Sequence, residues 1–453
     1  MIGNSPVTPV YKGKGSKNDV NNYRPISVMG HVAKLAERIV QHQLFSYLLS
    51  HDLISIDQSA FRPMHSTQTA LHRVIDAWLD NMQDKMLTGV CFLDIKKCFD
   101  TIDHKLLLKK LMLYGIENVE WKWFSEYLKG RSQIVRHNGV SQAEYVTAGV
   151  PQGSVLGPCL FTVFINDLSQ FSGDCTCNLY ADDAVIYCHD SSNTRIQQKL
   201  QDSVSSVSEW YSANKLALNA QKCEVMVLKT KRCNASDCLD IVLNDVHLNQ
   251  VNCAKYLGLN IDQNLSWNEY ISCLCSKISL KLQCLNRLKA CVPSEVLDTI
   301  YSSTIQPCID YAISVWGNTC DYNLDKIQRL QNFAARIVLR NFDYINFRGI
   351  NLVKELKWMN VRERCSYFTG ILMFKCVHGL APDYLINEID LYSDVNERES
   401  SRNNHQLHVY VPICSSQSFK YCGAILWNNL PNDLKQSPSL SVFKQHLKLY
   451  ICG

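Results

Sequence analysis

The sequence predicts an α/β fold in which a central β-sheet carries acidic side chains and a helical C-terminal part follows. Two observations support the sheet. Residues 178–187 place an Asp-Asp pair between β-forming apolar flanks, which is typical of a hairpin, and residues 88–94 are an apolar run that ends in an aspartate. After Asp262 the apolar residues recur at helical spacing, over residues 271–285 and again over residues 324–337.

The other elements follow in chain order. A basic, glycine-rich loop at residues 11–17 lies near the start, and two helices are expected before the first strand. A helix follows that strand, another begins at Pro158, and an amphipathic helix should back the sheet. The expected helices are residues 28–49, 68–78, 105–114, 158–168 and 200–211, the expected strands are residues 223–228 and 251–261, and the expected loop is residues 391–406.

Length and composition describe a globular chain. The 453 residues suffice for two or three domains, and a hydrophobic content of 46% supports a substantial core. Apolar stretches such as residues 159–165 are too short to span a bilayer, and the N-terminus lacks the basic start and apolar run of a signal peptide. We therefore expect an intracellular protein, in the nucleus or the cytoplasm, that is not secreted and has no membrane partner.

The distribution of charge and the spacing of the cysteines constrain the function of the chain only weakly. Residues 1–50 and 251–453 each carry a net charge of +4, whereas residues 51–250 carry −4. Basic flanks around an acidic centre suit a protein that grips phosphate backbones and binds cations, although a mixed surface also gives such differences by chance. None of the 21 cysteines belongs to a Cys-x-x-Cys pair, so we expect most of them to be buried thiols rather than zinc ligands.

Three carboxylates form the strongest candidate site. Asp182 and Asp183 repel each other at the expected hairpin tip and therefore require a positive partner, and Asp94 ends a separate buried strand. Phosphoryl transfer uses two divalent metal ions ~3.5–4 Å apart, held by such a cluster. A solvated Asp-Asp turn is the alternative for the pair alone. The third carboxylate favours the metal site.

Short motifs in a fixed order cover about residues 11–262, and they are specific only jointly. Among them, the glycines of residues 148–158 let the backbone approach a ligand closely. The motifs are Tyr23-Arg24-Pro25-Ile26-Ser27, Gln58-Ser59-Ala60-Phe61-Arg62, His65-Ser66-Thr67-Gln68-Thr69-Ala70-Leu71, residues 88–104, residues 148–158, Tyr180-Ala181-Asp182-Asp183, Leu218-Asn219-Ala220-Gln221-Lys222-Cys223-Glu224 and Lys255-Tyr256-Leu257-Gly258-Leu259. Together they resemble the reverse transcriptase of a non-LTR (LINE-type) retrotransposon of the jockey and chicken-repeat group. Cys98 departs from the family's usual alanine, which is a small-for-small change.

The resemblance implies a right-hand polymerase with the reverse transcriptase fold. Residues 1–87 would form the fingers, with a partial N-terminus, and residues 88–262 the palm with inserted finger elements. A helical thumb would follow at residues 263–320, and residues 321–453 would form a C-terminal helical region whose role the sequence leaves open.

The resemblance also implies the roles of individual side chains. Asp94, Asp182 and Asp183 would hold two Mg²⁺ ions, or Mn²⁺, and Lys222 would protonate the leaving pyrophosphate. The implied nucleotide-binding residues are Arg24 and Arg62 at the triphosphate, Gln152 at the nucleotide and template, and Phe99, whose ring would exclude a 2′-hydroxyl. Core packing is the alternative for Phe99, and bracing of the fingers is the alternative for Arg24.

The first thumb helix is expected to contact nucleic acid. Lys277, Lys281 and Lys289 lie off its apolar stripe, where they would follow the backbone of the primer–template duplex. A helical bundle with solvated lysines is the alternative.

We expect an RNA-directed DNA polymerase that joins dNTPs to a DNA primer on an RNA template. A decayed or co-opted copy that binds RNA without polymerising is one alternative, and an RNA-dependent RNA polymerase is another. The intact carboxylates argue against the first, and Phe99 with Tyr180-Ala181 before the Asp pair argues against the second. Because the chain starts inside the fingers, we expect a fragment or truncated reading frame whose endonuclease comes from another chain or a missing N-terminal domain.

Overall fold

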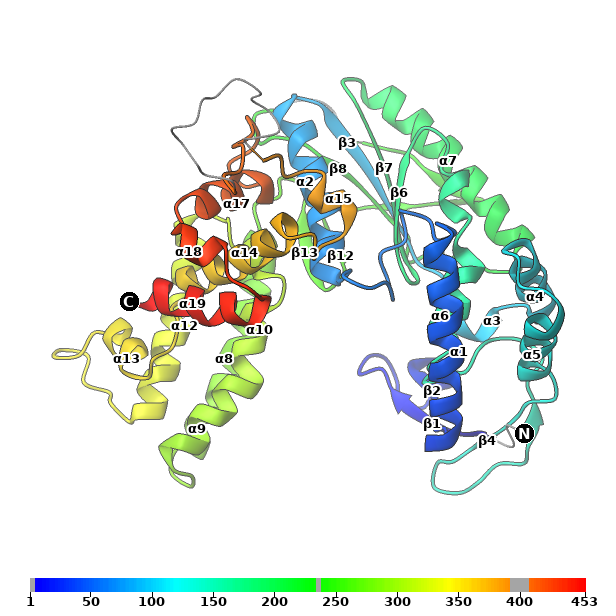
Figure 1. The fold of residues 1–453 in the computed structure, drawn as a ribbon, viewed down its shortest axis with the longest axis horizontal. Coiled ribbons are helices and arrows are strands. Elements are labelled where there is room, and N and C mark those ends of the chain that lie inside the picture. Colours follow the sequence, from blue (N-terminus) through cyan, green and yellow to red (C-terminus); the bar gives the residue numbers. More distant parts are fainter. Residues whose placement is uncertain (1–4, 234–237, 392–406) are drawn as a thin grey trace.

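The computed structural model describes residues 5–233, 238–391 and 407–453. Its ribbon forms an arch (Figure 1). The central sheet lies at the crown with the two helices that cover its faces, most of the other elements that precede or interrupt the sheet in sequence form one arm, and the helices that follow it form the other. The expected loop at residues 391–406 lies almost entirely outside the described residues.

The crown is a five-stranded sheet in the order β11-β8-β3-β7-β6. β3 pairs antiparallel with both β7 and β8. The sheet strands are β3 (Leu87–Leu93), β6 (Thr176–Tyr180), β7 (Asp183–Asp190), β8 (Glu224–Leu228) and β11 (Asn249–Gln250). The structure confirms the expected strand at residues 88–94 and the expected hairpin.

Two helices cover opposite faces of this sheet. Side chains alternate along a strand, so Val90 and Phe92 of β3 join one core with α2 (Thr67–Gln83), while Cys91 and Leu93 join another with α7 (Asn193–Ala213). Leu200, Val204, Val207 and Tyr211 of α7 are all buried, which confirms the predicted backing helix.

The first arm combines a small sheet with several helices. The sheet has the order β2-β1-β4-β5, and its strands are β1 (Ser5–Tyr11), β2 (Tyr23–Ser27), β4 (Ser132–Val135) and β5 (Glu144–Tyr145). The helices are η1 (Val20–Asn22), α1 (His31–Ser50), α3 (Cys98–Thr101), α4 (His104–Leu113), α5 (Asn118–Leu128), α6 (Gly157–Ile165) and η2 (Leu168–Phe171). Proline occupies the first turn of α6, as predicted.

The apolar residues at the start of α1 do not form its inner face. Val32, Leu35 and Ile39 are exposed, whereas Glu37 is only 1% exposed. Helical spacing predicts that such residues share a face, but it does not tell which face the rest of the protein covers.

The second arm is helical. It follows the hairpin of β12 (Cys253–Tyr256) and β13 (Leu259–Asp262) and begins with α8 (Asn268–Leu288). Then come α9 (Ser294–Ile300), η3 (Tyr301–Ile305), α10 (Gln306–Asp310), α11 (Ile313–Trp316), α12 (Asp321–Leu339), α13 (Gly349–Glu355), α14 (Val361–Val377), α15 (Asp383–Ile386), α17 (Phe419–Asn428), α18 (Asn432–Lys435) and α19 (Leu440–Cys452).

The apolar stripes predicted for two of these helices are buried. Ile271, Leu274, Ile278, Leu282 and Leu285 of α8 all pack inward. On α12, Leu324, Ile327, Ala334 and Ile337 do the same. Both stripes belong to the core that also includes α2 and one face of the central sheet, so this core runs across the boundary predicted at residue 320. A further core joins α14, α15, α17, α18 and α19.

The structure bears on two expectations drawn from composition, one about membrane-spanning segments and one about the burial of the cysteines. Along the three described segments, no helix is long and apolar enough to cross a membrane. The expectation for the cysteines is wrong in part, because only nine of the 21 thiols are buried and six are exposed. Several exposed cysteines lie on the outer faces of α8 and its neighbours, where spacing off the apolar stripe left them in solvent.

Candidate active site

The Asp-Asp pair lies where β6 turns into β7. Tyr180 pairs with Asp183, so the turn itself consists of Ala181 and Asp182. Ala181 has a φ of +54°, in the left-handed region that non-glycine residues seldom occupy. Its N–H donates to Oε1 of the fully buried Gln58 over 3.1 Å. The segment that contains Gln58 therefore holds this turn in place.

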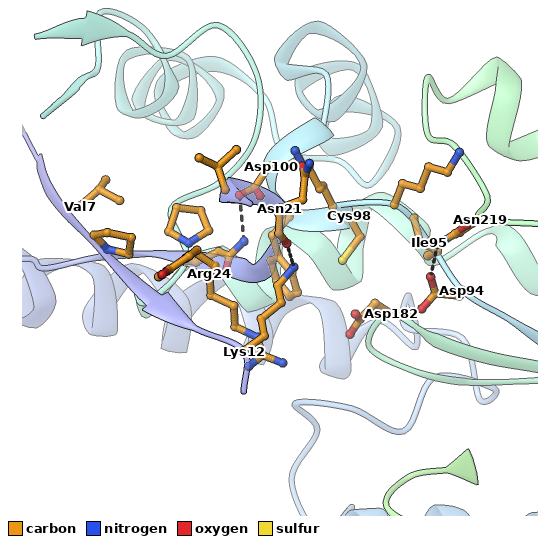
Figure 2. A pocket seen from close by; sticks show the side chains of 18 of the residues that line it. Val7, Lys12, Asn21, Arg24, Asp94, Ile95, Cys98, Asp100, Asp182 and Asn219 are labelled. Carbon is orange, nitrogen blue, oxygen red and sulfur yellow. Dashed lines mark hydrogen bonds between the residues drawn. The ribbon is translucent and has the colours of Figure 1, made fainter. Parts of the chain in front are cut away.

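Asp94 lies beside the hairpin because of strand register. Leu93, the last residue of β3, pairs with Ala184 of β7, so the next residue of β3 emerges alongside Asp183. Asp94 and Asp182 line the same pocket of about 1240 Å³, and Figure 2 shows their carboxylates next to each other. Reduced hydration, together with the charges of Asp182 and Asp94, raises the pKa of Asp183 to about 6. The structure thus places all three predicted carboxylates at one edge of the sheet, but only Asp94 and Asp182 line the pocket.

Two polar side chains from the stretch just before β8, Asn219 and Lys222, lie beside Asp94. The Asn219 side-chain amide donates to Asp94 Oδ2 over 3.2 Å, and its backbone N–H donates to the Asp94 carbonyl over 2.8 Å. The Lys222 ammonium lies 3.9 Å from Asp94 Oδ2. Sequence reasoning singled out Lys222 but missed Asn219, although both belong to the motif at residues 218–224.

Cys98, the position at which this sequence departs from the resemblance, lies against the carboxylate of Asp182. Cys98 lies above Asp182 in Figure 2 and is buried. Burial, and then the charge of Asp182, raises the pKa of this thiol far above its usual range. Cys98 therefore contributes a neutral S–H group beside the carboxylates rather than another negative charge.

The carboxylates suit a hard divalent cation. Within the described segments, no three His, Cys, Asp or Glu side chains form a ready-made metal cluster. Mg²⁺ does not require one, because it prefers oxygen ligands, retains several waters and is usually held by one or two carboxylates plus substrate phosphates. Asp94 and Asp182 open into the pocket and supply such oxygens. The donor set therefore fits Mg²⁺ that arrives with a triphosphate.

The pocket also contains three of the four predicted nucleotide-binding residues. Arg24, Phe99 and Gln152 line it together with the carboxylates. Gln152 donates its amide to Asp100 Oδ1 over 2.9 Å, which fixes its orientation. The Phe99 ring stacks on Phe161 with ring centroids 4.6 Å apart, so both interpretations of Phe99 have a physical basis.

Basic residues border the pocket on the side of the small sheet. Lys12 and Lys17, from the basic loop at residues 11–17, line it with Arg24. The Lys12 ammonium donates to the Asn21 carbonyl over 2.8 Å, which fastens this loop across its own base. Figure 2 shows Asp94 and Asp182 toward one end of the pocket and Lys12 and Arg24 toward the other, where Asp100 also lies.

The glycines of residues 148–158 pack against protein backbone. Gly149 has a φ of +85°, and a Cβ there would lie 2.7 Å from the Asp100 carbonyl oxygen. Gly153 has a φ of +102°, and a Cβ there would lie 2.9 Å from the Ser27 carbonyl oxygen. Gly149 therefore allows close packing against the backbone of Asp100, and Gly153 against the end of β2, while the expected approach of a ligand stays a prediction.

Arg62 lies outside this pocket. Its guanidinium donates to the carbonyls of Ser55 and Gln58 over 2.9 and 3.1 Å. The side chain therefore braces its own loop, and this geometry gives no support to its expected role at a triphosphate. A carbonyl-rich turn close in sequence is a ready partner for an arginine, and the motif alone could not reveal it.

The three lysines that the sequence predicted to contact a duplex have different surroundings. The Lys281 ammonium donates to the Thr304 carbonyl over 2.5 Å, and the Lys289 ammonium lies 4.1 Å from the centre of the Phe342 ring. Both therefore pack against neighbouring elements of the helical arm. Lys277 is exposed. Among the three, Lys277 is the one that a duplex can reach without a rearrangement.

Glu37 is a second residue that sequence reasoning missed. Its buried carboxylate accepts the N–H groups of Val155 and Leu156 over 2.7 and 3.3 Å, and the Tyr127 hydroxyl over 2.6 Å. These contacts tie α1 and α5 to the start of α6, directly after Gln152. A single glutamate in a helix is normally predicted to lie on the surface, so nothing in the sequence indicated this role.

Comparison with known proteins gives a consistent result. The family model described as "Reverse transcriptase (RNA-dependent DNA polymerase)" matches residues 14–261. The chain is 28% identical over 348 residues to a probable RNA-directed DNA polymerase from transposon X-element of Drosophila melanogaster, a match that covers 73% of this chain and 37% of the relative. It is 29% identical over 343 residues to the RNA-directed DNA polymerase from mobile element jockey of Drosophila funebris, with coverage of 73% and 37%.

A longer match extends into the helical arm. The RNA-directed DNA polymerase from mobile element jockey of Drosophila melanogaster is 28% identical over 422 residues, which cover 89% of this chain and 44% of the relative. The chain thus spans less than half the length of these relatives. Among solved structures, telomerase from Candida tropicalis aligns over 85% of this chain and 69% of its own, with a TM-score of 0.42 and 11% identity.

Proposed function

Because the chain belongs to the reverse transcriptase (RNA-dependent DNA polymerase) family, we propose that it is the polymerase of a non-LTR retrotransposon and extends a DNA primer along an RNA template. The relatives from jockey and X-element, which bear the name RNA-directed DNA polymerase, support this proposal. The single observation that carries it is the pocket that unites Asp94 and Asp182 with Arg24, Phe99 and Gln152.

Each group in the pocket has a task that fits its chemistry. Asp94 and Asp182 would hold divalent ions, which would supply positive charge to the primer hydroxyl and the triphosphate. The cations Lys12 and Arg24 neutralise the phosphates of the incoming nucleotide at the opposite end. Gln152, fixed by Asp100, offers its remaining polar atoms to the base pair.

Lys222 is placed to serve the leaving group. Its ammonium is the cation beside Asp94, and it lies within reach of a pyrophosphate bound at the carboxylates. Proton donation to a leaving oxygen contributes typically ~10²–10⁴-fold to a rate. The carboxylate of Asp94 holds this ammonium beside the site of the proposed metal ions.

A primer-extension assay tests the proposal. We expect the purified chain with Mg²⁺, poly(rA), oligo(dT) and dTTP to lengthen the primer. Absence of extension while the chain still binds the template would indicate the decayed alternative. Extension with UTP in preference to dTTP would indicate an RNA polymerase.

Sugar selection gives a sharper prediction. Phe99→Ala should raise ribonucleotide incorporation relative to deoxynucleotide incorporation by about 10- to 100-fold, because the removed ring is the proposed obstacle to the 2′-hydroxyl. The measurement is the ratio of incorporation efficiencies for UTP and dTTP. Phe99→Tyr keeps the ring and should leave the ratio low. An unchanged ratio in Phe99→Ala would mean that the Phe99 ring serves only core packing, against Phe161.

Duplex binding gives a prediction for the helical arm. Lys277→Gln should make the log–log salt dependence of primer–template binding shallower by about 0.9, the value for one lost phosphate contact. Lys281→Gln is the matched control, because its ammonium already bonds the Thr304 carbonyl. Equal slopes for wild type and Lys277→Gln would mean that α8 does not contact the duplex through this residue.

A further inference from the structure

The C-terminal region, whose role the sequence left open, returns to the palm. The short helix α15 lies against α2, close to the segment at residues 55–62 (Figure 1). That segment also contacts the hairpin that carries Asp182. A chain of contacts therefore connects residue 384 with the catalytic hairpin, although about 200 residues separate them in sequence.

The first link joins the segment to the hairpin. The Leu179 N–H donates to the Asp57 carbonyl, and the Ser59 N–H donates to the Leu179 carbonyl, each over 2.9 Å. The buried Gln58 side chain accepts the Ala181 N–H at the turn itself. Residues 57–59 thus act as an extra edge strand beside β6, and they hold both backbone groups of Leu179 and the strained residue of the turn.

The second link is Tyr384. Its hydroxyl donates to Thr69 Oγ1 over 3.2 Å and lies 3.4 Å from Ser59 Oγ. The guanidinium of Arg73 lies over its ring, 5.0 Å from the centroid, and donates to Asp57 Oδ1 over 2.9 Å. Tyr384 therefore touches the edge segment directly, through Ser59, and indirectly, through Arg73.

The third link fixes Tyr384 itself, because the surrounding C-terminal region is anchored on α2. The Phe419 N–H, at the start of α17, donates to the buried carboxylate of Asp76 over 3.0 Å. The Lys420 ammonium lies 2.6 Å from Asp80 Oδ2 and 3.2 Å from Glu388 Oε2, and so joins α2, α17 and the end of the α15 segment. Tyr384 is thus part of a docked body.

We infer that Tyr384 is a positioning residue of the polymerase site, through which the C-terminal region fixes the place of the Asp182 turn relative to Asp94. The inference rests on the proposed function for its effect on rate. The segment at residues 55–62 transmits the effect, because it contacts both Tyr384, through Ser59, and the turn, through Gln58. Nucleotide binding should be spared, since the cations that face the triphosphate lie on the other arm.

The test uses the full chain with two substitutions at one position. Tyr384→Phe removes the hydroxyl contacts with Thr69 and Ser59 and keeps the ring on Arg73, and Tyr384→Ala removes both. We expect the maximal rate of dTTP addition per active site, counted from the burst amplitude, to fall by about 10- to 100-fold in Tyr384→Ala, because a displacement of ~1 Å can cost ~10²-fold. Tyr384→Phe should fall less, and the dTTP concentration for half-maximal rate should change less than about twofold in both.

Hydrogen exchange of the peptide at residues 176–190 provides a readout that does not need activity. Exchange in this hairpin should be faster in Tyr384→Ala than in wild type, because the edge segment that protects it loosens. Tyr367→Phe, on α14 of the same region, is the matched control and should match wild type in both measurements.

The outcomes separate the inference from the proposed function. A wild-type chain that does not extend the primer would contradict the proposed function, and the exchange measurement would still decide whether Tyr384 fixes the hairpin. Exchange and rate per active site that are unchanged in Tyr384→Ala would overturn the inference. Faster exchange with an unchanged rate per active site, or a rise in the half-maximal dTTP concentration without a fall in maximal rate, would overturn it as well.

Discussion

Asp182→Asn should abolish DNA synthesis, with a fall in the rate of nucleotide addition of about 10³-fold or more, because charge stabilisation by a correctly held metal ion is worth several kcal/mol. Asparagine has the same shape, so the turn between β6 and β7 should persist. Primer–template affinity should remain within about twofold of wild type, since the duplex is held by phosphate contacts elsewhere. Single-turnover addition and a binding titration on the same preparation measure the two quantities.

A matched control separates this effect from a general loss of one negative charge. Asp202 is an exposed carboxylate on α7, on the far side of the sheet from α2. Asp202→Asn should therefore extend primers at the wild-type rate. If Asp182→Asn retained more than about a tenth of the wild-type rate, Asp182 would not be a ligand of the ions that catalyse the reaction.

Glu37→Ala should have the largest effect on stability among single substitutions near the site. It leaves the buried N–H group of Leu156, the part-buried N–H group of Val155 and the buried Tyr127 hydroxyl without their acceptor. Each unsatisfied buried group costs about 1–3 kcal/mol. We expect the free energy of unfolding to fall by about 3 kcal/mol or more, which urea denaturation measures. Glu37→Gln keeps the shape and one acceptor oxygen and should fall less.

Glu120 on the exposed face of α5 provides the control for this prediction. Glu120→Ala should change stability by less than about 0.5 kcal/mol. A Glu37→Ala chain as stable as Glu120→Ala would mean that waters replace the carboxylate and that the start of α6 needs no anchor from α1.

The sequence predicted the parts of the site that depend on local pattern. Asp94 and the Asp182 hairpin could be placed together because apolar runs define the strands and because strands that end at the same edge of a sheet bring their next residues together. The stripe on α8 was predictable for the same reason, since helical spacing alone identifies its inner face. These features need only the residues of one or two neighbouring elements.

Other features depend on partners distant in sequence. Off-stripe position predicts exposure for Lys281, but the Thr304 carbonyl on the following helical segment takes its ammonium. Glu37 is buried because the amides of residues 155 and 156 require an acceptor, which nothing in α1 reveals. The contact between Tyr384 and Ser59 joins positions 325 residues apart, and only the folded chain shows it.

The domain boundaries predicted from the sequence remain a prediction. The helix α2 precedes residue 88, yet it packs against the central sheet, and α12 follows residue 320, yet it shares a core with α8. The spacing of apolar residues in the sequence changes where one type of secondary structure is followed by another. Hydrophobic cores need not end there, because a helix buries its apolar face against whichever element lies opposite.

We propose that the pocket lined by Asp94 and Asp182 copies RNA into DNA. The most direct measurement supplies a defined RNA template of mixed sequence, an annealed DNA primer, four dNTPs and Mg²⁺, and sequences the products made by wild type, Asp94→Asn and Asp182→Asn. We expect full-length complementary DNA from wild type alone, and none when a chelator removes the metal. Complementary DNA from either substituted chain at the wild-type rate would contradict it, as would a wild-type chain that binds the primed template and adds no nucleotide.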